Sequence, residues 1–335
     1  MRPTIRVAAG LGVAAILGAC GGSTANLGGT PQDGGGGGGG PTIIATEIQE
    51  TPTSLVSDGT SLFWVSSDNV GGPLERMSVT GGAITAVVSG MLPGSSDLAV
   101  DEVNVYYQGQ TGELYRAPKD GSGSPTLISE GGALVGGWTT LGANAYWTKR
   151  IDGAAPAENT TVVIESAPLE GGAISVLGQF TSQGPSLGSG IGVDSTTVFI
   201  SSITVPLSYF AESAGIADGG VPTPASGTVP YCSSILSDTD GAYCAAVGSI
   251  LALHDDGTTT TVGALDTMYQ QGLMALDDTY VYWVDSVMVG TIMRAPKAGG
   301  TATIIARDAN PIAIAVDANA IYWSDEGGNI TRLAK

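Results

Sequence analysis

One pattern of hydrophobic and polar positions recurs along most of the chain. An aspartate is followed five residues later by an aromatic residue with apolar neighbours on both sides, as in DANAIYW near the C-terminus. Because the side chains of a strand alternate between two faces, apolar residues at successive positions predict strands that are buried on both faces. The pattern begins at seven positions: Asp58, Asp101, Leu141, Asp194, Asp238, Asp277 and Asp317, with only Leu141 replacing the aspartate.

Each copy continues in the same way. A strand that ends at a glycine-containing turn follows, for example LYRAPKDG, and a short β-branched segment such as PTLIS comes next. Successive copies start 39 to 53 residues apart, which is the length of a propeller blade of four strands. We therefore predict an all-β fold, a seven-bladed β-propeller of four-stranded antiparallel blades, over residues 41–335.

The two ends of the repeat predict how the ring closes. The last copy supplies three strands, whereas TIIATEIQETPTSLVSDG, which begins at Thr42, resembles TIIARDANPIAIAVDAN, which begins at Thr303. We expect the N-terminal strand Thr42 to Ala45 to be the outer strand of the last blade, where it would remove an open sheet edge.

The N-terminal residues predict export. Arg2 and Arg6 precede an apolar run that is too short to span a bilayer, which is typical of a signal peptide over residues 1–19. The run ends in LGAC, which resembles the bacterial lipobox, so we expect Cys20 to be lipidated; an ordinary cleavage site beside an unrelated cysteine is the alternative. Residues 20–40 are rich in glycine and predict a flexible tether.

The charge of the chain restricts its partners. It has 12 basic and 31 acidic residues, a formal net charge of −19, and such a surface repels nucleic acid. We expect the lipid anchor to hold the protein at the membrane of the cell envelope. By resemblance to other lipoproteins, Gly21 after the cysteine favours the outer membrane if the cell has one.

Two copies carry a resemblance to a known family. DDTYVYWVDSVMVGTIMRAPKAGG and DANAIYWSDEGGNITRLAK are similar to the YWTD repeats of low-density-lipoprotein-receptor-type propellers. The match covers Tyr282, Trp283 and Asp285 in the first of these copies, and Tyr322, Trp323, Ser324 and Asp325 in the second. The resemblance implies an extracytoplasmic, non-catalytic propeller, usually of six blades, that binds protein ligands. The chain also resembles bacterial propeller lipoproteins of the cell envelope.

The candidate chemistry is sparse. We interpret the repeated aromatics as blade core and the opening aspartates as turn residues that accept hydrogen bonds from downstream backbone amides. A ring of calcium ligands is the alternative for these aspartates, and no other cofactor is expected. His254 is the only histidine and lies in LALHDDG, which predicts a surface turn and no histidine-based metal site.

Cys232 and Cys244 remain once Cys20 is lipidated. An oxidising envelope favours their pairing, but a hairpin that turns at Asp240 would place Cys244 opposite about Ile235, several residues from Cys232. The sequence leaves this disulfide open.

Two departures from the repeat predict a binding patch. The third copy carries TKRIDGAAPAENTTVV between its second and third strands, and the fourth replaces its outer strands with SITVPLSYFAESAGIADGGVPTPASGTVPYC. If both excursions emerge at one end of neighbouring blades, they would form one surface, as loops on a rigid scaffold often do. The patch would consist of Lys149, Arg150, Asp152, Glu158, Tyr209, Phe210 and Glu212.

These observations favour a lipid-anchored binding or scaffolding module for a protein or glycan of the envelope. The alternative is a propeller enzyme, a carboxylate- or metal-dependent hydrolase or lyase that acts on a small molecule or glycan. No catalytic residue is assigned.

Overall fold

The fold consists of strands. The computed structural model describes residues 6–8, 40–46, 48, 51–66, 72–89, 93–109, 111–130, 134–151, 159–183, 187–204, 208–215, 223–224, 232–265, 273–285, 290–307 and 311–335. Every regular element in these ranges is a β-strand. A membrane-spanning helix is not found among them.

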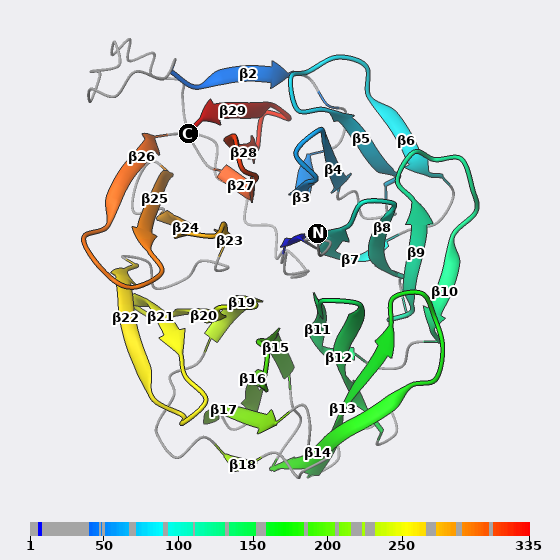
Figure 1. Cartoon of the computed structure of the whole chain (residues 1–335), viewed down its shortest axis with the longest axis vertical. Coiled ribbons are helices and arrows are strands. Elements are labelled where there is room, and N and C mark those ends of the chain that lie inside the picture. The colour runs from blue at the N-terminus through cyan, green and yellow to red at the C-terminus, as the bar shows by residue number, and fades with distance from the viewer. Residues whose placement is uncertain are drawn as a thin grey trace, which may run out of the picture.

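Within the described residues the strands form seven antiparallel sheets, which lie in a ring around a common centre (Figure 1). The first sheet has β3 (Pro52–Ser57), β4 (Ser61–Ser66), β5 (Leu74–Ser78) and β6 (Thr85–Val88). The second has β7 (Pro93–Val100), β8 (Asn104–Gly109), β9 (Leu114–Pro118) and β10 (Thr126–Ser129), and the third has β11 (Leu134–Leu141), β12 (Asn144–Arg150), β13 (Asn159–Pro168) and β14 (Ser175–Gln183).

The remaining sheets follow in chain order. The fourth has β15 (Leu187–Val193), β16 (Thr197–Thr204), β17 (Ser208–Gly215) and β18 (Thr223–Pro224), and the fifth has β19 (Cys232–Asp238), β20 (Gly241–Ala246), β21 (Ser249–Leu253) and β22 (Thr259–Ala264). The sixth has β23 (Met274–Leu276), β24 (Tyr280–Asp285), β25 (Thr291–Pro296) and β26 (Thr303–Arg307). The last contains β27 (Pro311–Val316), β28 (Ala320–Asp325) and β29 (Ile330–Ala334).

The N-terminal strand β2 (Thr42–Ala45) completes this last sheet. It pairs antiparallel with β29, and Thr42 lies opposite Arg332. This is the position predicted for it, because the C-terminal copy supplies only three strands. The two ends of the ring are thus joined by backbone hydrogen bonds.

The prediction of seven four-stranded blades is wrong. In the described part of the chain six sheets have four strands, but the sheet of β7 to β10 has five. Its additional strand is β1 (Arg6–Ala8), which pairs with β7 at the inner edge of that sheet. Counting repeats could not reveal this strand, because it comes from the predicted signal peptide and contains no copy of the motif.

The core lies between neighbouring sheets, as the double-sided apolar pattern predicts. Val56 and Phe63 of the first sheet pack against Leu98 and Tyr107 of the second. The last sheet packs against the first in the same way, with Tyr322 in contact with the cluster around Trp64 and Leu55. The repeated aromatics are buried, which confirms that they are core residues: Phe63, Tyr106, Tyr146, Phe199, Tyr243, Tyr282 and Tyr322.

Two glycines allow neighbouring sheets to approach closely. A methyl group added at Gly192 of β15 would lie 2.4 Å from Cγ2 of Ile235 in the next sheet, and one added at Gly263 of β22 would lie 2.5 Å from the indole ring of Trp283. Each glycine therefore provides the space that a large side chain of the following sheet occupies.

Candidate functional site

The opening aspartates form the turns between the first and second strands. Oδ1 of Asp58 accepts hydrogen bonds from the amides of Thr60, at 2.8 Å, and Ser61, at 2.7 Å. The same pair of bonds recurs at Asp101, Asp194, Asp277 and Asp317. This confirms the interpretation of these residues as turn residues.

The second carboxylate oxygen of several aspartates binds the repeated tyrosine of its own blade. The hydroxyl of Tyr106 donates to Asp101 Oδ2 at 2.6 Å, and the hydroxyl of Tyr282 donates to Asp277 Oδ2 at 2.7 Å. Tyr322 donates to Asp317 Oδ2 at 2.9 Å. Burial, together with the hydrogen bond to Asp317 and its charge, raises the pKa of Tyr322 to about 12, so these tyrosines act as neutral donors.

A lysine from the following blade binds some of the same aspartates. Lys119 Nζ donates to Asp58 Oδ2 at 2.7 Å, and Lys335 Nζ donates to Asp277 Oδ2 at 2.5 Å. Lys297 forms the corresponding ion pair with Asp238. The three lysines occupy equivalent positions, directly after the third strand of their copies: Lys119, Lys297 and Lys335. This repeated position is a sequence signal from which the ion pairs could have been predicted. We call these three ion pairs the inter-blade latches.

The latches affect the ionisation of the aspartates. Burial raises the pKa of Asp58, but the hydrogen bonds from Lys119, Thr60 and Ser61 together outweigh it, so the net pKa lies below its usual value. Asp277 follows the same balance with Lys335 and Tyr282. These carboxylates are therefore ionised at neutral pH and stabilise the scaffold.

The junction between the last and the first sheet uses a serine where the latches use a lysine. Ser57 Oγ donates to Asp317 Oδ2 at 2.7 Å, and both side chains are buried. Burial raises the pKa of Asp317, while the hydrogen bonds from Ser57, Asn319 and Tyr322 lower it further than burial raises it. The repeated acidic groups are thus engaged in turns and blade contacts around the ring.

The single histidine lies in a surface turn, as predicted. His254 is exposed, and its Nε2 lies 2.8 Å from Thr260 Oγ1. The backbone amide of Gly257 donates to the carbonyl of His254 and closes the turn. Among the described residues, no group of three or more His, Cys, Asp or Glu side chains is placed to hold a metal ion.

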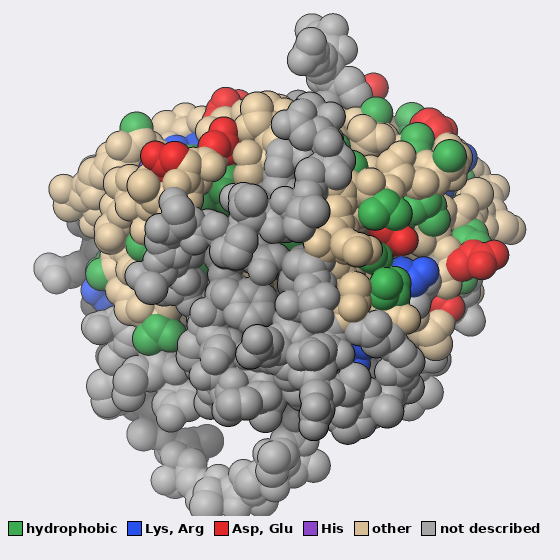
Figure 2. Space-filling view, turned by 90° about the horizontal axis from the view of Figure 1, so that it is seen from below, with side chains coloured by type: hydrophobic (Ala, Val, Ile, Leu, Met, Phe, Trp, Pro, Cys, Tyr) green, Lys and Arg blue, Asp and Glu red, His purple; other side chains and the backbone are tan. Residues whose placement is uncertain are grey.

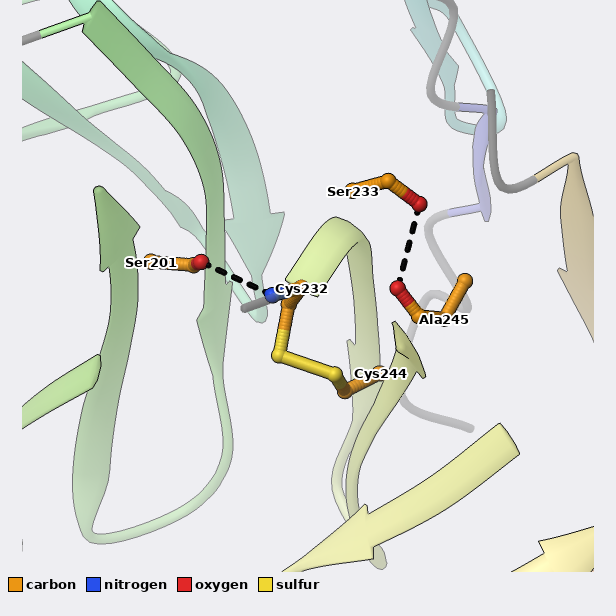
Figure 3. The surroundings of a disulfide bond; sticks show 5 residues. All are labelled: Ser201, Cys232, Ser233, Cys244 and Ala245. Carbon is orange, nitrogen blue, oxygen red and sulfur yellow. Dashed lines mark hydrogen bonds between the residues drawn. A yellow bond between two sulfur atoms is a disulfide. The ribbon is translucent and has the colours of Figure 1, made fainter. Parts of the chain in front are cut away.

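Cys232 and Cys244 form a disulfide whose Cα atoms are 5.4 Å apart (Figure 3). Cys244 lies opposite Ile235, as the hairpin register predicts, but a register shift between Cys232 and Ser234 pairs Cys232 with Ala246. Because side chains alternate along a strand, this shift places Cys232 on the same face as Cys244. The bulge, which the sequence does not reveal, is what brings the two sulfurs together.

The predicted patch is divided between strands and undescribed residues. Lys149 and Arg150 end β12 and pair with Val163 and Val162 of β13. Asp152 and Glu158 lie outside the described residues, as does Cys20. The expectation that the outer strands of the fourth blade are replaced is wrong, because β17 contains Tyr209, Phe210 and Glu212 and pairs with β16 over its whole length.

Antiparallel pairing nevertheless places part of the patch at one end of the ring. The β12–β13 connection follows Arg150, and the β16–β17 connection precedes Ser208. Both join a second strand to a third strand in neighbouring sheets, so both emerge at the end opposite the aspartate turns. Lys149, Arg150 and Tyr209 are the residues of the patch that are nearest to these connections along the strands.

The described surface lacks a concentrated basic region on the side seen in Figure 2. Acidic and apolar side chains are scattered there, and among the described residues the few basic side chains stand apart from one another. This agrees with the net charge of −19.

Comparisons with known proteins show the fold. No protein-family model matches the chain, and no curated protein matches it in sequence. Among solved structures, the chain is similar to the WD40 β-propeller domain of Doa1, with 12% identity, 88% of this chain and 97% of that chain covered, and a TM-score of 0.62. YCF48 bound to D1 peptide has 12% identity, coverages of 88% and 95%, and a TM-score of 0.54.

An enzyme is also among the similar structures. A puromycin hydrolase S511A mutant complexed with PGG has 12% identity and a TM-score of 0.60; 84% of this chain is covered but only 50% of that chain. The chain thus spans about half the length of this hydrolase. At these identities the likeness extends to architecture alone: the protein has an all-β propeller fold built from four-stranded antiparallel blades.

Proposed function

We propose that the protein is a non-catalytic binding or scaffolding module of the cell envelope, exported by residues 1–19 and lipid-anchored at Cys20. The glycine-rich segment 20–40 would hold the propeller away from the membrane, which would be the outer membrane in a cell that has one. The expected ligand is a protein or glycan of the envelope.

The observation that carries this proposal is that the repeated carboxylates form structural hydrogen bonds and ion pairs. The aspartates of the first, second, sixth and last sheets accept bonds from their own turns, from blade tyrosines, from lysines of the next blade or, at the junction, from Ser57. They hold a rigid frame together. We favour binding over carboxylate-dependent hydrolysis or elimination because these acids are engaged in structural contacts.

The departures from the repeat support the same reading. In the third sheet β13 has 10 residues and β14 has 9, so this blade extends beyond its neighbours. The disulfide lies in the fifth sheet, at the start of β19 and directly after the irregular fourth copy of the repeat. Variable segments on a rigid propeller are a common place for partner recognition.

A pull-down from detergent-solubilised envelopes tests this function. The bait is the full chain, beside a variant with Lys149→Ala, Tyr209→Ala, Phe210→Ala and Glu212→Ala. The matched control is Val103→Ala, because Val103 is 64% exposed and lies in the β7–β8 turn at the opposite end of the ring. Circular dichroism checks that each bait is folded.

We expect one partner to be retained by the wild type and by the Val103 control and to be lost from the quadruple variant. Equal capture by all three baits would exclude the patch as the binding surface. If the folded wild type retains no partner, and hydrolytic activity is found in screens of small molecules and glycans, the binding function is overturned in favour of the enzyme.

A further inference from the structure

The innermost strand of the second sheet has a backbone partner toward the centre of the ring. β1 pairs antiparallel with β7, and Arg6, Val7 and Ala8 lie opposite Val100, Ala99 and Leu98. Figure 1 shows β1 inside the ring beside β7. Each described sheet has one innermost strand, and among these strands only β7 pairs with a further strand on its inner edge.

The register shows which backbone groups form this edge. The amide of Asp101 donates to the carbonyl of Asn104 at 3.0 Å, and Ala99 lies opposite Tyr106. In an antiparallel ladder bonded and non-bonded pairs alternate, so Ala99 and Asp101 direct their backbone groups toward β8. Leu98 and Val100 therefore direct theirs toward the centre, where Ala8 and Arg6 lie opposite them.

The strand that offers these groups is packed on both faces. Leu98, Ala99 and Val100 are at most 1% exposed, because Leu98 and Val100 belong to the cluster between the first and second sheets and Ala99 to the one between the second and third. A strand that is fixed by core packing and has N–H and C=O groups without a strand partner is a template for an added strand. Because this strand is already ordered, most of the conformational entropy lost on binding is lost by the incoming segment.

We propose that the inner edge of β7 is a binding site for an extended peptide of a partner protein, which adds to it as an antiparallel strand. In the full chain the segment Arg6–Ala8 occupies this site. Removal of the signal peptide would expose the backbone N–H and C=O groups of Leu98 and Val100. This inference rests on the proposed binding function and adds to it a second site, for an extended peptide. Main-chain hydrogen bonds supply the affinity, so recognition depends on an extended backbone with free amides.

The test uses the full chain and two proline variants. Proline lacks the amide hydrogen, so Arg6→Pro with Ala8→Pro removes the two donors that face β7. Val7→Pro is the matched control, because the Val7 amide belongs to the non-bonded pair and points away from β7. The probe is a fluorescent peptide of residues 2–12, beside the same peptide with both proline substitutions.

We expect the amides of Leu98 and Val100 to exchange with deuterium at least about tenfold faster in the double variant than in the wild type or the Val7 control. The double variant should also bind the labelled peptide, measured by fluorescence anisotropy, while the proline-containing peptide should not bind. Equal exchange in all three proteins, or no uptake of the peptide by the double variant, overturns the proposal.

The outcomes separate this inference from the proposed function. A partner captured equally by the wild type and the double proline variant, together with unchanged amide exchange, supports a binding module and rejects the β7 edge. Peptide uptake by the double variant without capture of any envelope partner supports the edge and rejects the patch around Lys149 and Tyr209.

Discussion

Lys119 offers the sharpest test of the inter-blade latches. Its ammonium group lies 2.7 Å from Asp58 Oδ2, and the two side chains are 24% and 7% exposed. The same nitrogen donates to the carbonyl of Asp101 at 3.2 Å. Lys119→Met keeps the apolar stem of the side chain but leaves the ionised Asp58 without its charged partner.

The expected loss lies between two limits. Exposed ion pairs contribute roughly 0–1 kcal/mol, whereas breaking a buried pair costs about 3–5 kcal/mol. Because Asp58 is nearly buried and Lys119 is partly exposed, we expect Lys119→Met to lower the free energy of unfolding by about 2 kcal/mol. Lys149→Met is the control, since Lys149 forms no ion pair with the described residues, and it should change stability by less than about 0.5 kcal/mol.

Urea unfolding, followed by tryptophan fluorescence, measures these differences. A double-mutant cycle with Asp58→Asn should give a coupling energy of about 1–2 kcal/mol between the two side chains. The difference between wild type and Lys119→Met should also depend on pH. The pKa of Asp58 is lowered in the folded state, so its contribution is present above the unfolded pKa and is lost as pH falls through the folded pKa.

We therefore expect the difference to be complete at pH 7 and to shrink below about pH 4. A coupling energy near zero, or a difference that stays constant from pH 7 to pH 3, would refute the assignment of the latch as a stabilising ion pair.

Three further predictions concern the packing of the ring. Gly263→Ala should destabilise the protein by about 1–3 kcal/mol in urea unfolding, because the added methyl group would lie 2.5 Å from the Trp283 ring; Gly40→Ala, with nothing within 4 Å, is the control, and equal stability of the two variants would contradict the packing argument. Replacing Cys232 and Cys244 by serine should cost about 3 kcal/mol, since the bond closes a loop with a sequence separation of 12; an unchanged denaturation midpoint under non-reducing conditions would show that the bond contributes nothing. Deleting residues 41–50 should lower the melting temperature sharply by calorimetry, because β2 pairs with β29 and Ile44 packs against the cluster that joins the last and first sheets; an unchanged melt would exclude this closure.

The sequence by itself determined the features that depend on local alternation and on the repeat. The apolar runs around Phe63, Tyr106 and Tyr322 predict strands buried on both faces, and the copies of the motif predict a propeller. The similarity between the segments at Thr42 and Thr303 predicts the closing strand. Asp58 and its equivalents could be read as turn residues because an aspartate binds amides two and three residues away, which is a property of the local chain.

The tertiary structure alone decided the contacts between sheets. Lys119 and Asp58 are 61 residues apart in the chain. The sequence around either residue does not predict their contact, because it depends on how the ring places the third strand of one blade beside the first turn of the preceding blade. The disulfide depends on a one-residue bulge that exchanges the face of Cys232. The segment Arg6–Ala8 carries no strand pattern of its own, and its pairing with β7 is set by a free backbone edge that side chains do not encode.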